Sequence, residues 1–207
     1  MKTMAMLEEI KKLQAISEVG LLYGNNEYDR ERYTELKEMS LRWLAALSDF
    51  TFEEWKTSLP LPIDYPTAKV DIRGMVISSD EKILLVKETS DGKWALPGGW
   101  ADVGYSPKEV IIKEINEETG LVCDVVRLLA IFDKRKHPHP PQALYVYKFL
   151  FYCKAISSTL QKGFDLLDVG YFAIDNLPPL SEDRILKPQI ELGYNKILRQ
   201  DKETYFE

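Results

Sequence analysis

The chain has 207 residues, a formal net charge of −6 and 45% apolar residues, so we expect one sizeable core and a small appended unit. No apolar run approaches the roughly 18 residues that cross a bilayer, and acidic residues come too early for a secretory signal, which predicts a cytoplasmic protein without a membrane partner. The acidic balance and the lack of a basic stripe argue against nucleic acid as a partner.

The first sixty residues predict two helices. Apolar residues recur at helical spacing over residues 4–22, and again from about Asp29 to Leu47, with a Gly-Asn turn at residues 23–26 between them. Two helices bury too little apolar surface to be stable alone. We therefore expect a helical hairpin over residues 1–59 that docks on the main domain or on another subunit, and we favour a homodimer. Three prolines make residues 60–66 a stiff linker to a main domain over residues 67–207.

The main domain is predicted to be an α/β domain. Segments rich in β-branched and aromatic residues predict strands at 69–77, 82–86, 122–132, 144–154 and 169–174. Cys123 and Cys153 lie within two of these runs, and we expect both as buried thiols. A last helix is expected after Ser181, whose hydroxyl can cap it, with Pro188 either kinking it or starting a second segment. With the acidic helix described next, the pattern favours an α/β/α sandwich with a mixed sheet.

A helix carrying three glutamates follows a glycine loop at residues 94–99. The sequence from Ser106 to Glu109 has the capping-box arrangement with a proline at the first helical position, and Gly120 ends the helix. The glutamates at 114, 117 and 118 share one face, where carboxylates repel one another unless a cation lies between them. The alternative is an ordinary solvated helix face, although such a face needs no preceding glycine loop. The pattern therefore predicts a divalent metal site.

This segment resembles the Nudix hydrolase signature, Gly-x5-Glu-x7-Arg-Glu-U-x-Glu-Glu-x-Gly-U, in which U is aliphatic. The matching residues are Gly99, Glu114, Ile115, Glu117, Glu118, Gly120 and Leu121, whereas Tyr105 and Lys113 replace the usual first glutamate and arginine. The resemblance implies the Nudix α/β/α fold and a metal-dependent pyrophosphohydrolase. The two departures motivate a second hypothesis, a catalytically weak module that senses nucleotides.

The N-terminal helices extend the resemblance over nearly the whole chain. Together with residues 96–103, the segments 13–15 and 28–33 resemble a bacterial Nudix subgroup that acts on nucleoside diphosphates linked to another moiety. Members of that subgroup often carry lysine at the position of Lys113 and lack the first glutamate. The resemblance implies an ADP-ribose pyrophosphatase first and a CDP-choline pyrophosphatase second. Cleansing of oxidised nucleoside triphosphates or removal of RNA 5′ ends is left open.

The resemblance also implies roles for individual residues. The expected cofactor is Mg²⁺ or Mn²⁺, held by Glu114, Glu117 and Glu118 with help from the backbone at Gly98. One of these glutamates is expected to activate the attacking water, or a further acid from a distal loop, Glu182 or Asp183, does so. Lys113 is expected among the substrate-binding residues.

Two further features of the sequence suggest substrate contacts. The loop 133–141 holds Arg135, Lys136, His137 and His139, which we predict to bind the diphosphate. The alternative is an exposed hairpin tip that prolines stiffen. A zinc site built from the two histidines is disfavoured, because no further ligand is suitably spaced. Trp94 and Trp100 flank the glycine loop, so either indole is a candidate to stack on a base, with a place in the core as the alternative.

Overall fold

The structure, a computed structural model, describes residues 2–61 and 63–207, with side chains described from residue 5 onward; position 62 of the expected linker lies outside the described residues. The chain forms two compact units. The first runs through Ala68 and includes Pro141–Tyr145, and the second comprises Lys69–Pro140 and Val146–Glu207.

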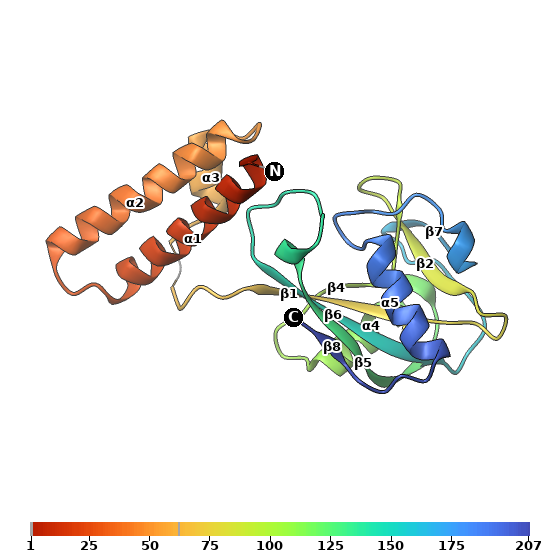
Figure 1. Cartoon of the computed structure of the whole chain (residues 1–207). Coiled ribbons are helices and arrows are strands. Elements are labelled where there is room, and N and C mark those ends of the chain that lie inside the picture. The colour runs from red at the N-terminus through yellow and green to blue at the C-terminus, as the bar shows by residue number, and fades with distance from the viewer. Residues whose placement is uncertain (1, 62) are drawn as a thin grey trace. The chain divides into compact units, whose positions relative to one another are not determined.

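The first unit contains the predicted helical hairpin. Its helices are α1 (Lys2–Tyr23), α2 (Glu27–Ala46) and a short third helix, α3 (Phe52–Ser58) (Figure 1). Asn26 caps α2 by accepting a hydrogen bond from the Asp29 N–H at 2.7 Å. The core of the unit consists of Leu7, Ile10, Leu41 and Leu44, with Phe52, Trp55 and Leu59 packed against it. The third helix was not predicted, although Thr51 and Glu54 form a capping box at its start.

The second unit contains two sheets. Across the five-stranded sheet the order is β4 (Gly98–Trp100), β1 (Lys69–Val76), β6 (Val146–Ala155), β5 (Cys123–Asp133) and β8 (Tyr205–Phe206). Across the three-stranded sheet the order is β3 (Trp94–Ala95), β2 (Ile83–Glu88) and β7 (Leu166–Phe172). The pairs β1–β6 and β5–β8 are parallel and the other pairs are antiparallel. The mixed sheet predicted from the sequence is confirmed.

Two helices cover the sheets through separate apolar cores. Helix α4 (Pro107–Thr119) buries Val110, Ile111 and Ile115 in a cluster with Ile72 of β1. Helix α5 (Lys187–Leu198) contributes to a second cluster that contains Met75 of β1. Because alternate residues of a strand point to opposite faces, one strand supplies both cores. This arrangement is the predicted α/β/α sandwich.

The C-terminal part of the second unit differs from the prediction. A turn occupies residues 182–184, and α5 begins only at Lys187 with Pro188 in its first turn, so the proline starts the helix. Ser181 is fully buried and does not cap α5. Its N–H donates to the Trp94 carbonyl oxygen at 2.8 Å instead. The expectation of a helix starting directly after Ser181 was therefore wrong.

Two simpler expectations can be compared with the fold. Cys123 and Cys153 are free and buried, as predicted. In the described part of the chain, none of the helices combines the length and apolar character needed to cross a bilayer.

Candidate active site

The acidic helix α4 begins and ends as its sequence predicts. The Ser106 hydroxyl accepts a hydrogen bond from the Glu109 N–H at 3.3 Å, and the Glu109 carboxylate accepts one from the Ser106 N–H at 2.7 Å. Gly120, with φ of 72°, ends the helix in the left-handed conformation. The buried isoleucines fix which face of α4 packs on the sheet. The glutamates consequently lie on the part of the helix that borders the glycine loop.

Two of the three glutamates lie against that loop. Gly98 has φ of 136°, and a Cβ there would come within 2.0 Å of the Ile72 carbonyl oxygen, so only glycine allows β4 to approach β1 this closely. The Gly98 N–H donates to Glu118 Oε2 at 2.8 Å. A Cβ on Gly99 would come within 3.0 Å of Glu114 Oε1. Glu117, in contrast, is exposed and lies 3.9 Å from the Lys113 ammonium.

Positive charge only partly compensates the carboxylates beside the glycine loop. The pKa of Glu118 is raised to about 8, mainly by burial and also by nearby Glu114 and Glu88, although Arg73 and the Gly98 N–H oppose the shift. Burial also raises the pKa of Glu114 and that of Glu88. A carboxyl group with a raised pKa is one whose charge is poorly stabilised. A bound cation would supply that stabilisation.

A buried network of charged side chains adjoins these acids. Arg73 Nε donates to Asp71 Oδ1 at 2.9 Å, Arg73 Nη1 donates to the Leu96 carbonyl oxygen at 3.1 Å, and the Lys148 ammonium donates to Asp71. Burial alone would raise the pKa of Asp71, but Arg73 and Lys148 hold it below its ordinary value. Burial lowers the pKa of Lys148 to about 8. This network was not predicted from the sequence, although two charged residues, Asp71 and Arg73, stand at alternate positions of an otherwise apolar strand.

The two residues that depart from the signature contact each other. The Lys113 ammonium donates to Asp102 Oδ2 at 2.9 Å and lies 5.3 Å from the centre of the Tyr105 ring. The hydrogen bond with Asp102 is the largest cause that raises the pKa of Lys113. Lys113 therefore ties the loop before α4 to the helix itself.

The turn at residues 182–184 places a cation beside one of the acids of the site. Glu182 and Asp183 have exposed side chains. The next residue, Arg184, forms an ion pair with Glu88, with 2.8 Å between Nε and Oε1. Glu88 and Arg184 were not identified from the sequence, where 95 positions separate them and no local pattern connects them.

The basic loop after β5 balances much of its charge with acids of its own unit. Arg135 Nε lies 3.0 Å from Asp133 Oδ2, and the Arg135 N–H donates to Asp133 Oδ1 at 3.0 Å. His137 Nε2 lies 3.0 Å from Glu207 Oε1. Lys136 is exposed. The loop thus presents less positive charge than its sequence suggests.

His139 lies inside this loop as a neutral side chain. It is 4% exposed, and its Nδ1 donates to the Glu182 carbonyl oxygen at 2.5 Å. The pKa of His139 is lowered to about 4, mainly by burial and also by the nearby cations Lys148 and Lys134. The neutral ring carries its one proton on Nδ1, so Nε2 can accept a hydrogen bond but cannot donate one. This buried Nε2 has no hydrogen-bond partner in the described part of the chain.

The two tryptophans beside the glycine loop occupy different environments. Trp94 packs edge-on against Phe172, with ring centres 4.6 Å apart, and belongs to the core on the α5 side. Trp100 is 51% exposed at the end of β4. Trp100 is thus exposed, whereas Trp94 is partly buried.

The donor chemistry around α4 suits a hard divalent cation. Glu114 and Glu118 offer carboxylate oxygens with raised pKa values, and oxygen is the ligand atom that Mg²⁺ and Mn²⁺ prefer. Within residues 2–61 and 63–207, however, no three acidic, histidine or cysteine side chains converge as a metal-ligand set. Glu117 lies 3.9 Å from the Lys113 ammonium, so a cation held by all three glutamates would compete with this ion pair.

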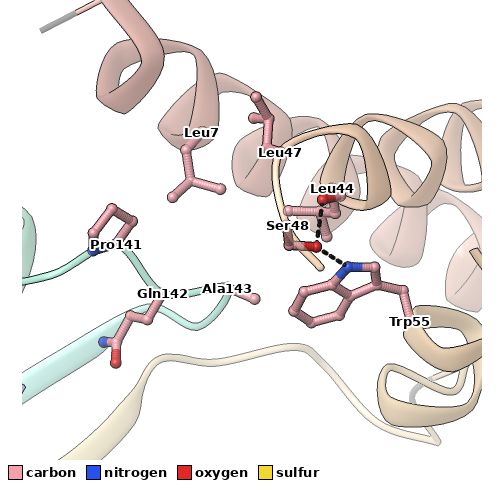
Figure 2. A pocket seen from close by; sticks show the side chains of 8 residues that line it. All are labelled: Leu7, Leu44, Leu47, Ser48, Trp55, Pro141, Gln142 and Ala143. Atoms are coloured by element: carbon pink, nitrogen blue, oxygen red, sulfur yellow. Dashed lines mark hydrogen bonds between the residues drawn. The ribbon is translucent and has the colours of Figure 1, made fainter. Parts of the chain in front are cut away.

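A separate cavity lies within the first unit. It has a volume of about 160 Å³ and is lined by Leu7, Leu44, Leu47, Ser48, Trp55, Pro141, Gln142 and Ala143 (Figure 2). Two of the three polar side chains in its wall are hydrogen-bonded, because Trp55 Nε1 donates to Ser48 Oγ at 2.9 Å and that hydroxyl donates to the Leu44 carbonyl oxygen at 2.8 Å; the third is Gln142. Since the rest of the wall is apolar, the cavity favours an apolar occupant.

Comparison with known proteins gives matches over both units. A family model described as the NUDIX domain matches residues 69–192, and one described as a UDP-X-like, N-terminal oligomerisation domain matches residues 4–58. The Bacillus subtilis protein YjhB, provisionally named an ADP-ribose pyrophosphatase, is 37% identical over 201 residues, which are 97% of this chain and 96% of YjhB. The ADP-ribose pyrophosphatase of Methanocaldococcus jannaschii is 34% identical over 122 residues, 58% of this chain and 69% of that protein.

Solved structures give the same picture. A crystal structure of a UDP-X diphosphatase is 38% identical, and the match covers 100% of both chains with a TM-score of 0.63. A crystal structure of an ADP-ribose pyrophosphatase from Streptococcus suis is 37% identical, with a TM-score of 0.62 over 68% of this chain and 100% of that one.

Proposed function

We propose a substrate class for this chain, which belongs to the Nudix hydrolase family. As a Nudix pyrophosphohydrolase it acts on small nucleotides, and we infer that its substrate is a nucleoside diphosphate linked to a further moiety. ADP-ribose is the first candidate and CDP-choline the second. The proposal rests on the poorly compensated carboxylates that α4 holds beside the Gly98 loop. The names of the relatives support ADP-ribose, and the full-length similarity to a UDP-X diphosphatase adds UDP-linked compounds to the substrates worth testing.

Nudix hydrolases generally need divalent cations, and we propose Mg²⁺ or Mn²⁺ held by Glu114, Glu117 and Glu118 with the backbone of Gly98. When bound, the cation would neutralise the diphosphate and acidify the attacking water. The chain itself would supply the proton acceptor. Cation binding would keep the carboxylates of α4 ionised at neutral pH, and one that the cation does not fully occupy, such as Glu118, would accept the water proton, with Glu182 as the alternative base. The water oxygen then bonds to one phosphorus while the bond between that phosphorus and the bridging oxygen breaks. The products are two phosphate monoesters.

Residues outside the acidic helix would orient the nucleotide. Trp100, with its exposed indole, is proposed to stack on the base. Lys113 and the loop residues Arg135, Lys136, His137 and His139 are proposed to contact the rest of the substrate. For His139 the contact would be a hydrogen bond accepted from a substrate hydroxyl, because the ring is neutral and its Nε2 has a free lone pair.

A substrate panel tests this proposal. We would incubate the full chain, with Mg²⁺ and separately with Mn²⁺, with ADP-ribose, CDP-choline, a UDP-sugar, nucleoside triphosphates and 5′-triphosphorylated RNA, and identify the products by chromatography. We expect two phosphate monoesters from a diphosphate-linked substrate. Pyrophosphate released from a triphosphate would favour triphosphate cleansing or RNA-end removal instead. Saturable binding without turnover would favour the nucleotide-sensing module.

We also propose that the chain forms a homodimer through its first unit. The matching family description names this region an oligomerisation domain, and the unit presents both an apolar cavity and the exposed side chains of Met6, Leu47 and Phe50. Light scattering after gel filtration should give twice the mass of one chain. Leu47→Glu should shift the mass toward the monomer, whereas Leu198→Glu, at an exposed leucine of α5, should not. A monomeric wild type, or equal behaviour of the two variants, would contradict the proposal.

A further inference from the structure

The turn at residues 181–184 is fastened to the strand that leads into the glycine loop. The Ser181 N–H donates to the Trp94 carbonyl oxygen at 2.8 Å, and the Trp94 N–H donates to the Pro179 carbonyl oxygen at 3.0 Å. The Arg184 N–H closes the turn by donating to the Ser181 carbonyl oxygen at 2.8 Å. Since Trp94 begins β3 and Gly98 begins β4 four residues later, the backbone of this turn holds a fixed position relative to the glycine loop.

Arg184 projects from this turn with part of its guanidinium still available. Its Nε forms the ion pair with Glu88, and its Nη1 donates to Ser181 Oγ at 3.2 Å. A guanidinium carries five N–H donors, and Nη2 makes no hydrogen bond within the described part of the chain, although the positive charge also acts on Asp91. The Arg184 side chain is 29% exposed, whereas that of Glu88 is 12% exposed. The carboxylate is therefore the fixed partner and the guanidinium reaches toward solvent.

The Arg184–Glu88 pair belongs to the same group of charges as the acidic helix. The negative charge of Glu88 acts on Glu118, and the positive charge of Arg73 acts on both carboxylates. Arg73 itself is buried and bonded to Asp71 and to a backbone carbonyl. Lys113 is bonded to Asp102. Arg184 is thus the cation of this group that combines partial exposure with an uncommitted donor.

We propose that Arg184 binds the diphosphate of the substrate, and that Glu88 is a positioning residue that holds the guanidinium ready. This inference rests on the function proposed above and adds to it a phosphate-binding residue outside the signature. A guanidinium can donate two parallel hydrogen bonds to phosphate oxygens, which fixes orientation as well as charge. The positive charge of Arg184 would also offset the repulsion that the site's carboxylates exert on an anionic substrate.

The alternative is that Arg184 only neutralises the half-buried charge of Glu88. A double-mutant cycle separates the two roles. If Arg184 serves Glu88 alone, loss of the guanidinium should have no effect once Glu88 has been replaced by glutamine. If Arg184 binds the diphosphate and Glu88 positions it, loss of the guanidinium should still weaken binding in the Glu88→Gln background, although by less than in the wild type.

Calorimetric titration with inorganic pyrophosphate in Mg²⁺ measures binding without turnover. We expect Arg184→Gln to raise the dissociation constant by about 10- to 100-fold, the typical contribution of charge-assisted hydrogen bonds. Arg184→Lys should recover part of the loss. The matched control is Lys187→Gln, at an exposed cation three residues away that pairs with Glu191. Thermal unfolding of each variant shows whether it is folded.

The proposal is overturned if Arg184→Gln binds pyrophosphate as the wild type does, if the wild type does not bind it, or if the effect of Arg184→Gln disappears in the Glu88→Gln background. These outcomes are distinct from a failure of the proposed function. Turnover of a diphosphate-linked substrate with an unaffected Arg184→Gln variant would reject only the role of Arg184. Loss of pyrophosphate binding in that variant, without turnover of any panel substrate by the wild type, would reject only the proposed hydrolysis.

Discussion

The acidic helix α4 and the basic loop after β5 each gather charges of mainly one kind, and they differ in how far their charges are balanced. Beside the glycine loop, burial raises the pKa of Glu114 and takes that of Glu118 to about 8. In the basic loop, Asp133 pairs with Arg135 and Glu207 lies beside His137. The helix thus has a deficit of countercharge, whereas the loop supplies much of its own.

This difference shows that charge in a sequence is not the same as charge available for binding. Burial and partners decide how much of it remains, and neither can be read from composition. The poorly stabilised charge of α4 identifies the acidic helix as the better candidate for chemistry. Single substitutions of charged residues in the two regions test whether the acidic helix contributes more to turnover than the basic loop does.

The largest effect is expected at Glu118. Glu118→Gln keeps the shape of the side chain and an oxygen acceptor for the Gly98 N–H but removes the charge and the proton acceptor. We expect kcat/KM for the best panel substrate to fall on the order of 10²–10⁴-fold, the usual contribution of a general base. Glu191→Gln, at an exposed glutamate of α5, is the matched control and should leave turnover unchanged. A loss of less than tenfold in Glu118→Gln would remove Glu118 from the catalytic assignment.

The second prediction concerns the pH dependence of stability without metal. Because the pKa of Glu118 is about 8 in the folded chain, against an ordinary value of 4.5, the folded state binds this proton more tightly than the unfolded state does. The resulting stabilisation is complete below about pH 4.5 and is lost as the pH rises through about 8. Each pKa unit corresponds to about 1.4 kcal/mol, so the loss should reach a few kcal/mol. Glu118→Gln should therefore gain stability relative to the wild type as the pH rises.

Urea unfolding in a chelating buffer at several pH values measures this difference. Burial also raises the pKa values of Glu114 and Glu88, but both groups remain in the variant, so the difference between the two proteins isolates Glu118. Added Mg²⁺ should restore the wild type at pH 8 more than the variant. A constant stability difference from pH 5 to pH 9 would show that the fold does not raise the pKa of the Glu118 carboxyl group.

The sequence predicted those parts of the site that depend on local spacing. The capping box, the terminal Gly120 and the three glutamates of α4 all lie within one segment, and helix periodicity was enough to place them. Short strands such as β3 and β4 were not predicted, because two or three residues carry no periodic signal. Helix α3 was missed despite its capping box, since the helix has only seven residues.

The parts of the site that escaped prediction are contacts between distant segments. Glu88 meets Arg184, and His139 meets the carbonyl of Glu182, only because the strands bring these segments together. Ser181 likewise resembled a helix cap, yet its backbone is bound to β3. Local propensity cannot identify such partners, so the charge state of each group followed only from the fold.

The smallest effect is expected in the basic loop, where the comparison is between Lys136 and Arg135. Lys136 is exposed and takes part in none of the ion pairs found in the described part of the chain, whereas the charge of Arg135 is balanced by Asp133. We expect Lys136→Gln to raise KM about threefold with kcat unchanged, because an exposed charge contributes on the order of 1 kcal/mol or less. Arg135→Gln should raise KM less.

Steady-state kinetics at low and high salt checks both variants. The effect of Lys136→Gln should shrink at high ionic strength, since exposed charges are screened over about 10 Å at 0.1 M salt. If Arg135→Gln instead raises KM more than Lys136→Gln does, the substrate must displace Asp133 from Arg135. The internal pairing seen in the loop would then be a resting arrangement, and the contrast with the acidic helix would hold only before substrate binds.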